Sequence, residues 1–187
     1  ATFVNDHAHQ TVETVDLLRA IEKASGRNLL YLFDQYVYRG GHPDYKVAYT
    51  WDGDSKLVKI TVTQTQVGNK TNPKELFDLK LPIGFGSLPE KKDKAPEIKT
   101  FTIRIHEREQ TFYFPLEHKP DFISFDVGNH ILKTVELEYP LPELKNQLQQ
   151  DPDPLSRICA AEALGKKGGL EAVKAFSTAL QEEAFWG

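Results

Sequence analysis

The chain has 187 residues, with 23 Lys plus Arg against 27 Asp plus Glu, so its formal net charge is −4. Hydrophobic residues make up 40% of the chain and the mean hydropathy is −0.47, which is typical of a soluble globular protein and excludes a disordered or membrane-spanning one. A mildly acidic chain without a basic block also excludes nucleic acid as an expected partner. The single cysteine, Cys159, excludes an internal disulfide and is compatible with reducing surroundings.

The composition also indicates that this chain is part of a longer protein. The sequence contains no methionine, and it closes on large apolar side chains, in 183–187, that continue a helical pattern. Natural termini are usually polar and frayed. We therefore expect an excised fragment whose parent continues beyond both ends.

Residues 11–43 have helical periodicity. Apolar side chains recur at helical spacing from Val15 to Ala24, and Ser25-Gly26 is a C-cap signal. Asn28 is the expected N-cap of a second helix. The apolar stripe of that helix is expected to comprise Leu29, Leu32, Phe33, Tyr36 and Val37. Two glycines and a proline in 39–43 then end it.

From Tyr45 to Leu137 the period becomes two, as in half-buried antiparallel strands. Asp52-Gly53-Asp54 predicts a turn, and Val127-Gly128-Asn129-His130 predicts a tight hairpin turn. The expected strands cover 45–51, 57–66, 77–83, 101–105, 111–116, 122–126 and 131–137. This run of short strands without an intervening helix predicts an antiparallel β-sandwich. The charged, proline-bracketed segment 88–97 is expected to be an exposed loop.

From Pro140 the period is helical again. Pro142 fits the first turn of a helix, and Asp151-Pro152-Asp153-Pro154 breaks the chain before a second helix that we expect to end at Gly165. A third helix follows over 170–180. Short alanine-rich helices joined by a glycine turn form the unit of an α-solenoid, and one such unit cannot bury its apolar face alone.

The segment His106-Glu107-Arg108-Glu109-Gln110 comes close to the zinc motif HExxH. That motif needs two histidines one helical turn apart, with the glutamate as the base. Residue 110 is Gln, so the second ligand is missing, and the segment lies between two expected strands. We expect a charged hairpin here and no catalytic role.

The remaining candidate residues lack sequence partners. His7 and His9 alone cannot close a zinc site, and Cys159 lies on an apolar helix face as expected for a buried structural thiol. Gly84-Phe85-Gly86 is too short for a phosphate loop, and Phe112-Tyr113-Phe114 predicts core residues with one outer ring. The other histidines, in expected turns or loops, are His42, His118 and His130. We assign no catalytic, cofactor-binding or metal-binding residue to this chain.

Three stretches of the chain carry a resemblance to a known family. Residues Thr11–Gly26, 29–37 and Gly40-Gly41-His42-Pro43 resemble the closing helices of the thermolysin-like domain in the aminopeptidase-N family of zinc metallopeptidases (gluzincins). The family pattern there is T-x-D-L…E-x-x-S-G-x-x-L-x-x-F-F-x-Q-W…G-x-P; this chain has Leu32-Phe33 for the Phe pair and Tyr36 for the Trp. Residues 47–52 and 57–66 resemble the first strands of the family's β-sandwich domain, and 153–165 resembles a HEAT-type repeat.

The resemblance implies three parts in the family's order. Residues 1–43 would be the helical tail of the catalytic domain, 44–139 the β-sandwich domain and 140–187 the start of a HEAT-like helical domain. The expected fold class is therefore mixed and mainly β, with a central antiparallel sandwich of about seven strands flanked by helices. Members of the family remove N-terminal residues from peptides, using one zinc held by HExxH and a downstream glutamate, and a G-x-M-E-N segment that grips the substrate amine. None of these motifs occurs in this sequence.

We therefore expect a non-catalytic bridging fragment of a cytoplasmic zinc aminopeptidase. Zinc and the peptide substrate belong to the parent, and the fragment contacts the missing catalytic and helical domains without binding nucleic acid or membrane. One alternative is a catalytically dead scaffold or protein-interaction module related to the same family. Another is an independent binding module for carbohydrate or protein.

Overall fold

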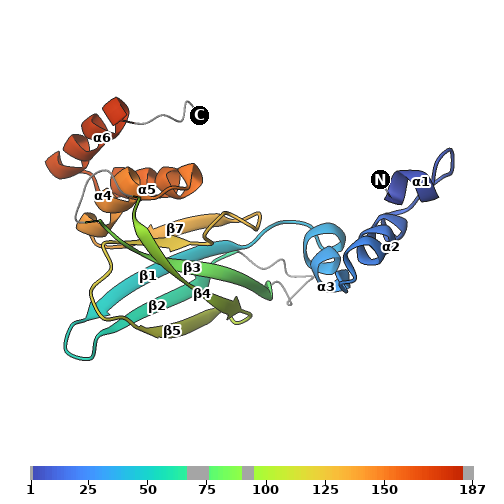
Figure 1. The fold of residues 1–187 in the computed structure, drawn as a ribbon, viewed down its shortest axis with the longest axis horizontal. Helices are drawn as coiled ribbons and strands as arrows, with labels where there is room; N and C mark the ends of the chain where they lie inside the picture. Colours follow the sequence, from blue (N-terminus) through green and yellow to red (C-terminus); the bar gives the residue numbers. More distant parts are fainter. Residues whose placement is uncertain (1, 67–75, 90–94, 183–187) are drawn as a thin grey trace. The chain divides into compact units, whose positions relative to one another are not determined.

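A computed structural model describes residues 2–66, 76–89 and 95–182, which form two compact units, 1–42 and 43–187. The first unit is helical and the second contains two sheets and a helical segment (Figure 1). The middle of the predicted loop 88–97 and the apolar end 183–187 lie outside the described residues. In the described part of the chain, no helix is both long enough and apolar enough to cross a membrane.

The first unit contains α1 (Thr2–Asp6), α2 (Thr14–Ser25), α3 (Leu30–Phe33) and the π-helix η1 (Asp34–Tyr38). The N-cap of helix α2 is Glu13, whose backbone N–H donates to Asp16 Oδ2 at 3.0 Å. It ends at Gly26, which has the positive φ of 68° that glycine adopts without strain, so the predicted C-cap is confirmed.

The predicted helix after Asn28 exists but differs in detail. The N-cap is Leu29, so the predicted N-cap, Asn28, is wrong by one position. Asn28 nevertheless supports the start of the helix, because its Oδ1 accepts from the Leu30 N–H at 3.2 Å. The last turns widen into η1, and Val37, expected in the buried stripe, is 51% exposed. A π-helix has more residues per turn, so a 3.6-residue pattern no longer predicts its buried face.

In its described residues, 43–66, 76–89 and 95–182, the second unit contains seven strands in two sheets. The first sheet has the order β5-β2-β1-β7 and the second the order β4-β3-β6. Their bounds are β1 (Asp44–Asp52), β2 (Leu57–Gln64), β3 (Leu79–Ser87), β4 (Glu97–Ile105), β5 (Glu109–Pro115), β6 (Phe122–Phe125) and β7 (Thr134–Glu138). The prediction of seven short strands between helical segments is confirmed at this level.

Two predictions about strand pairing are wrong. Strand β7 pairs parallel with β1, starting from Asp44 opposite Thr134, so the sheets are not wholly antiparallel. The predicted hairpins at 106–110 and 127–130 instead connect different sheets, because β4 and β6 belong to one sheet and β5 and β7 to the other. Alternating apolar residues predict that a strand exists, but they do not specify its neighbour.

The two sheets bury one shared hydrophobic cluster. Aromatic rings meet across it: Tyr45 of β1 lies 5.5 Å from Phe125 of β6, and Phe114 of β5 lies 5.1 Å from Phe85 of β3, measured between ring centroids. Alternate residues of each strand contribute to it, as the period of two requires. Its fully buried aliphatic members include Val47, Val58, Ile60, Val62, Leu81, Ile83 and Ile105.

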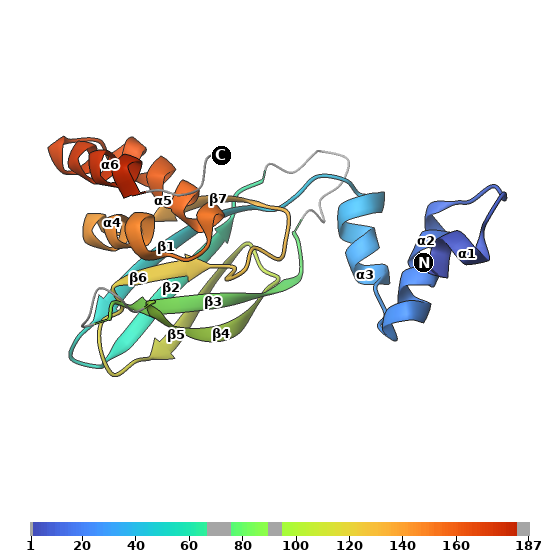
Figure 2. The ribbon, with the colours of Figure 1, turned by 45° about the horizontal axis from the view of Figure 1, so that its top comes forward.

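Three helices follow the strands in the same unit: α4 (Leu141–Gln150), α5 (Pro154–Lys167) and α6 (Leu170–Glu182). Helix α4 packs on β6 and α5 packs on β7, so the helices cover the side of the sheets where these two edge strands lie (Figures 1 and 2). The predicted breaker before α5 is confirmed, since the Asp153 Oδ1 accepts from the Leu155 N–H at 3.1 Å as an N-cap. The predicted end at Gly165 is wrong: α5 continues to Lys167 and ends at Gly168, where φ is 64°.

Candidate functional site

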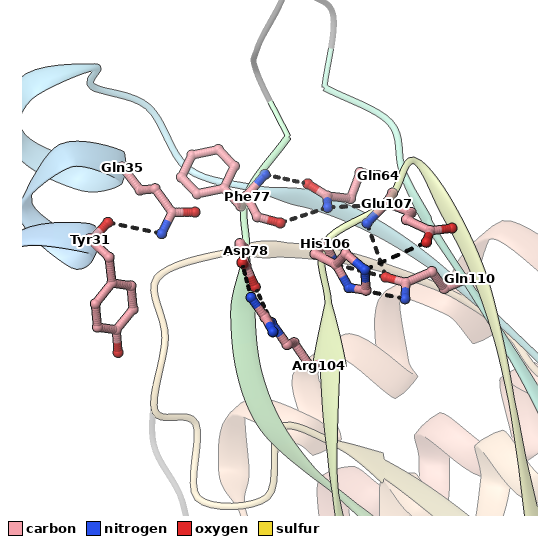
Figure 3. Close-up of polar contacts among 9 residues, drawn as sticks. All are labelled: Tyr31, Gln35, Gln64, Phe77, Asp78, Arg104, His106, Glu107 and Gln110. Carbon is pink, nitrogen blue, oxygen red and sulfur yellow. Dashed lines mark hydrogen bonds and ion pairs between the residues drawn. The ribbon is translucent and has the colours of Figure 1, made fainter.

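The segment 106–110, which comes closest to a catalytic motif, comprises the turn after β4 and the first two residues of β5 (Figure 3). Gln110 Oε1 accepts from the backbone N–H groups of His106, at 2.7 Å, and Glu107, at 3.0 Å. Its amide nitrogen also lies 3.2 Å from Nδ1 of His106. Gln110 is therefore a neutral acceptor that holds the turn together. Residues 106 and 110 do not share the helical face that HExxH requires.

The imidazole and carboxylate of this turn are poorly suited to acid–base chemistry. His106 Nε2 lies 3.5 Å from Glu107 Oε1, and both side chains are largely exposed. General acid–base groups act on a substrate held within hydrogen-bond reach, usually in a cleft that excludes water. No described pocket is lined by either residue.

Beside this turn, the buried side chain of Gln64 ties three segments together (Figure 3). Its Oε1 accepts from the Phe77 N–H at 2.9 Å, and its Nε2 donates to the carbonyls of Phe77 at 2.9 Å and Glu107 at 3.2 Å. A buried amide with both ends paired stabilises one arrangement of the surrounding strands. Gln64 continues the alternation of Val58, Ile60 and Val62, and this was the sequence signal for its burial.

Asp78 and Arg104 form a two-point ion pair at the same end of the second sheet (Figure 3). Arg104 Nε and Nη2 donate to the Asp78 carboxylate oxygens at 2.7 and 2.5 Å. These hydrogen bonds hold the pKa of Asp78 below its usual value and raise that of Arg104. Both side chains are about half exposed, so the pair joins β3 and β4 and is not a perturbed acid or base in a cleft.

The other sequence candidates do not assemble into a site. In the residues that the structure describes, no group of three or more His, Cys, Asp or Glu could hold a metal ion. The ring of His7 lies tilted beside that of Phe3, with 5.3 Å between the centroids, and His118 is exposed. Burial raises the pKa of the Cys159 thiol, which disfavours the thiolate that a nucleophile needs. The assignment of no site residue stays a prediction.

The aromatic run and the glycine pair lie in strands. Phe114 is buried and Tyr113 is 61% exposed, as the prediction of core residues with one outer ring requires. Gly84 and Gly86 are in the middle of β3, where neighbouring side chains lie too close for a Cβ atom. Close strand packing, rather than a phosphate loop, explains both glycines.

The sequence reasoning missed a buried ion pair at the end of β6. Asp126 is fully buried, and its Oδ2 accepts from Lys133 Nζ at 2.5 Å and from the Ile131 N–H at 3.1 Å. The Lys133 side chain is only 7% exposed. Positive φ angles occur in this turn at Asp126, Gly128 and Asn129. The ion pair therefore joins the two ends of a turn with unusual backbone angles between the sheets. The sequence feature that accompanies this ion pair is Asp126 followed by Gly128-Asn129, and we interpreted it only as a turn.

A cleft of about 310 Å³ lies between β7 and the end of α5 in the second unit, lined by Tyr49, Ala163 and Lys167 among others. Ion pairs occupy its charged rim: Lys166 Nζ lies 2.8 Å from Glu136 Oε1, and Lys46 Nζ lies 2.9 Å from Glu138 Oε1. The volume is at the lower end for ligand pockets.

Comparisons with known proteins were made for family, sequence and fold. No family model matches the chain, and no curated protein matches its sequence. A solved structure, aminopeptidase A of Legionella pneumophila in complex with aspartic acid, is similar in fold, with a TM-score of 0.66 and 18% sequence identity. The match covers 98% of this chain and 22% of the aminopeptidase chain. At this identity the likeness establishes a shared fold, and this chain spans about a fifth of that protein's length.

Proposed function

We propose that this chain is a non-catalytic bridging part of a zinc aminopeptidase related to the aminopeptidase-N family. The observation that carries the proposal is the fold likeness to an aminopeptidase, which extends over 98% of this chain. The order of helices, two sheets and helices supports the same relation. In this proposal the two sheets are the family's β-sandwich domain, and α4–α6 begin its HEAT-like domain.

The chemistry of the chain fits a part without its own metal. Zinc sites use three or four His, Cys, Asp or Glu ligands, and the described residues offer no such group. The residues present therefore do not fit a zinc ion, and no catalytic step is assigned to them. The parent would hold the zinc and remove N-terminal residues from peptides in the cytoplasm.

The physical role of the chain would be to fix the direction in which the helical domain leaves the sheets. The two sheets share a close-packed cluster, and such interiors have low compressibility and transmit position. Helices α4 and α5 pack directly on β6 and β7, so their placement follows that of the sheets. A helical domain held in this way would limit which peptides reach the parent's active site.

The exposed face of α6 supports the assignment of α4–α6 to a HEAT-like domain. On α6, Leu170, Val173 and Leu180 are 69%, 58% and 84% exposed. A solenoid repeat buries such a stripe against a neighbouring helix, so the exposed stripe fits a helical repeat of this kind. The same stripe also favours the second candidate function, a catalytically dead scaffold of the same family that binds a protein partner through its helices.

The reading frame that encodes residues 1–187 tests the proposal. An intact HExxH with a later glutamate, encoded upstream, supports an active aminopeptidase as the parent. A related upstream domain without those residues supports the scaffold instead. An upstream region unrelated to a thermolysin-like domain contradicts both.

A further inference from the structure

Helix α4 carries polar side chains on a face that is otherwise part of the core. Glu143, Gln147 and the helix-ending Asp151 are four residues apart, and each is at most 2% exposed. They alternate on that face with Leu144 and Leu148, which belong to the hydrophobic cluster. Residues at this spacing lie one above another along a helix, so the three form a single buried polar row.

Two buried tyrosines belong to the same core cluster as Leu144 and Leu148 of this face. Tyr49 of β1 and Tyr139, which follows β7, are 4% and 1% exposed, and their rings meet edge-to-face at 6.0 Å. Burial raises the pKa of both phenols. The charge of Glu143 raises the pKa of Tyr49 further, and those of Cys159 and then Asp151 raise the pKa of Tyr139. The polar row and the two phenols therefore form one seam between α4 and the strands, which we call the α4 seam.

The seam contains more polar atoms than partners. Of the buried oxygens without a hydrogen-bond partner among the described residues, five belong to the seam: Tyr49 Oη, Tyr139 Oη, Glu143 Oε2, Gln147 Oε1 and Asp151 Oδ2. Burial raises the pKa of the Asp151 carboxyl group, which is also held by side-chain hydrogen bonds with Ser124 and Gln147 that act against the effect of burial. The other oxygen of Glu143 is accounted for by Lys119 Nζ, 2.7 Å away. A buried polar group without a partner costs about as much as a lost hydrogen bond, and almost all such groups in native proteins are paired.

The chemistry of the five oxygens identifies the kind of partner. Two are phenolic hydroxyls that need an acceptor, and three are carboxylate or amide oxygens that need a donor. Water supplies both from one small molecule, and buried water commonly makes about three such hydrogen bonds. A metal ion fits less well, because no three acidic or imidazole groups converge in the described part of the chain.

We propose that the α4 seam is a binding site for internal water molecules that join Glu143, Gln147 and Asp151 of α4 to the hydroxyls of Tyr49 and Tyr139. Water then completes the attachment of helix α4 to the strands. The inference depends only on the buried oxygens and holds whether or not the proposed function is correct.

A high-resolution crystal structure of residues 1–187 tests this inference directly. We expect ordered water about 2.6–3.2 Å from these oxygens. In the Tyr139→Phe variant, which preserves the ring's shape, the water that contacts residue 139 should be lost. The matched control is Tyr113→Phe, which removes an exposed hydroxyl on β5 and should leave every water of the seam in place.

Water-selective nuclear Overhauser experiments in solution give an independent readout. Cross-peaks from long-lived water to the rings of Tyr49 and Tyr139 are expected in the wild type, with those to residue 139 weakened in Tyr139→Phe. Direct pairing of the five oxygens with protein groups in the crystal overturns the proposal. So does an ion at the site, identified by its anomalous signal, or the absence of water cross-peaks.

Discussion

Gly86 and Phe122 are register partners in β3 and β6, and the ring of Phe122 lies where a side chain on residue 86 would be. A Cβ built on Gly86 would lie 2.2 Å from the Cε1 and Cζ atoms of that ring. Phe122 is fully buried, so the ring cannot swing into solvent. The pair sets how closely the chain of β3 approaches the core residues of β6.

Gly86→Ala should therefore destabilise the chain by about 1–3 kcal/mol, the usual cost of overpacking a core. Urea unfolding followed by tryptophan fluorescence measures this change. Gly165→Ala is the matched control, because a Cβ at this position inside α5 meets nothing within 4 Å. It should instead stabilise by about 0.5–1 kcal/mol through helix propensity. Equal stability of the two variants would contradict the described packing of β3 on β6.

The buried ion pair between Lys133 and Asp126 predicts a large loss of stability when Lys133 is replaced by an apolar residue. Lys133→Met leaves the fully buried Asp126 carboxylate without its cation and should cost about 3–5 kcal/mol. The comparison is Lys46→Met, which breaks the exposed pair with Glu138 and should cost about 0–1 kcal/mol. The double variant Asp126→Asn/Lys133→Met should recover part of the loss, because it removes the unpaired charge. A Lys133→Met variant as stable as Lys46→Met would show that the pair is not buried.

Asp151 predicts a stability change with a definite sign in pH. Burial raises the pKa of the Asp151 carboxyl in the folded chain above the unfolded pKa of about 3.9. The stability that this carboxyl contributes is therefore complete at low pH. It is lost as pH rises from the unfolded pKa through the folded pKa. Asp151→Asn keeps an acceptor for the Asp153 N–H, which lies 3.0 Å from Asp151 Oδ1, and removes the charge. Its free energy of unfolding, relative to wild type, should therefore increase between pH 4 and pH 7.

Asp52→Asn should behave in the opposite way and serves as the control for Asp151→Asn. Hydrogen bonds from Ser55, and then from the Asp54 N–H, lower the pKa of Asp52. The stability that the Asp52 carboxylate contributes is present above its unfolded pKa, and it is lost as pH falls through its folded pKa. The variant should thus lose stability relative to wild type as pH rises from acid to neutral. Parallel pH profiles for the two variants would contradict the assigned burial of Asp151.

Completing the near-motif should not create a zinc site. Gln110→His restores the letters HExxH, but residues 106–110 run from a turn into β5, between strands of different sheets, and form no helix. The variant loses the acceptor for two backbone N–H groups and should be destabilised by about 1–2 kcal/mol. Zinc titration by calorimetry should give the same weak response as wild type. A tight, single-site zinc isotherm that appears only in the variant would refute this geometry.

Local patterns predicted the elements well, and long-range pairing poorly. Alternation from Tyr45 to Leu137 located all seven strands because half-buried strands show their period in the sequence. The parallel pairing of β1 with β7 depends on where the chain travels after β6, which no local pattern encodes. The helix end at Gly165 was missed because a glycine inside a helix costs only about 1 kcal/mol, and the turn requiring positive φ comes later, at Gly168.

The buried polar groups show the same limit of sequence reasoning. Gln64 occupies an inward position of β2 and could have been identified from the alternation. Glu143 and Gln147 also share a face with Leu144 and Leu148, but polar residues on helices are usually exposed, so the pattern alone favoured solvent. Asp126 and Lys133 are separated by an irregular turn, and only the three-dimensional path of that turn places them together.

The central claim is that residues 1–187 contribute a frame and no catalysis, and a hydrolysis assay tests it most directly. The purified chain, supplied with zinc and a panel of aminoacyl-amide substrates, should release no amine above the rate of a blank with zinc alone. Turnover above that blank, abolished by His106→Ala or Glu107→Ala, would contradict the claim.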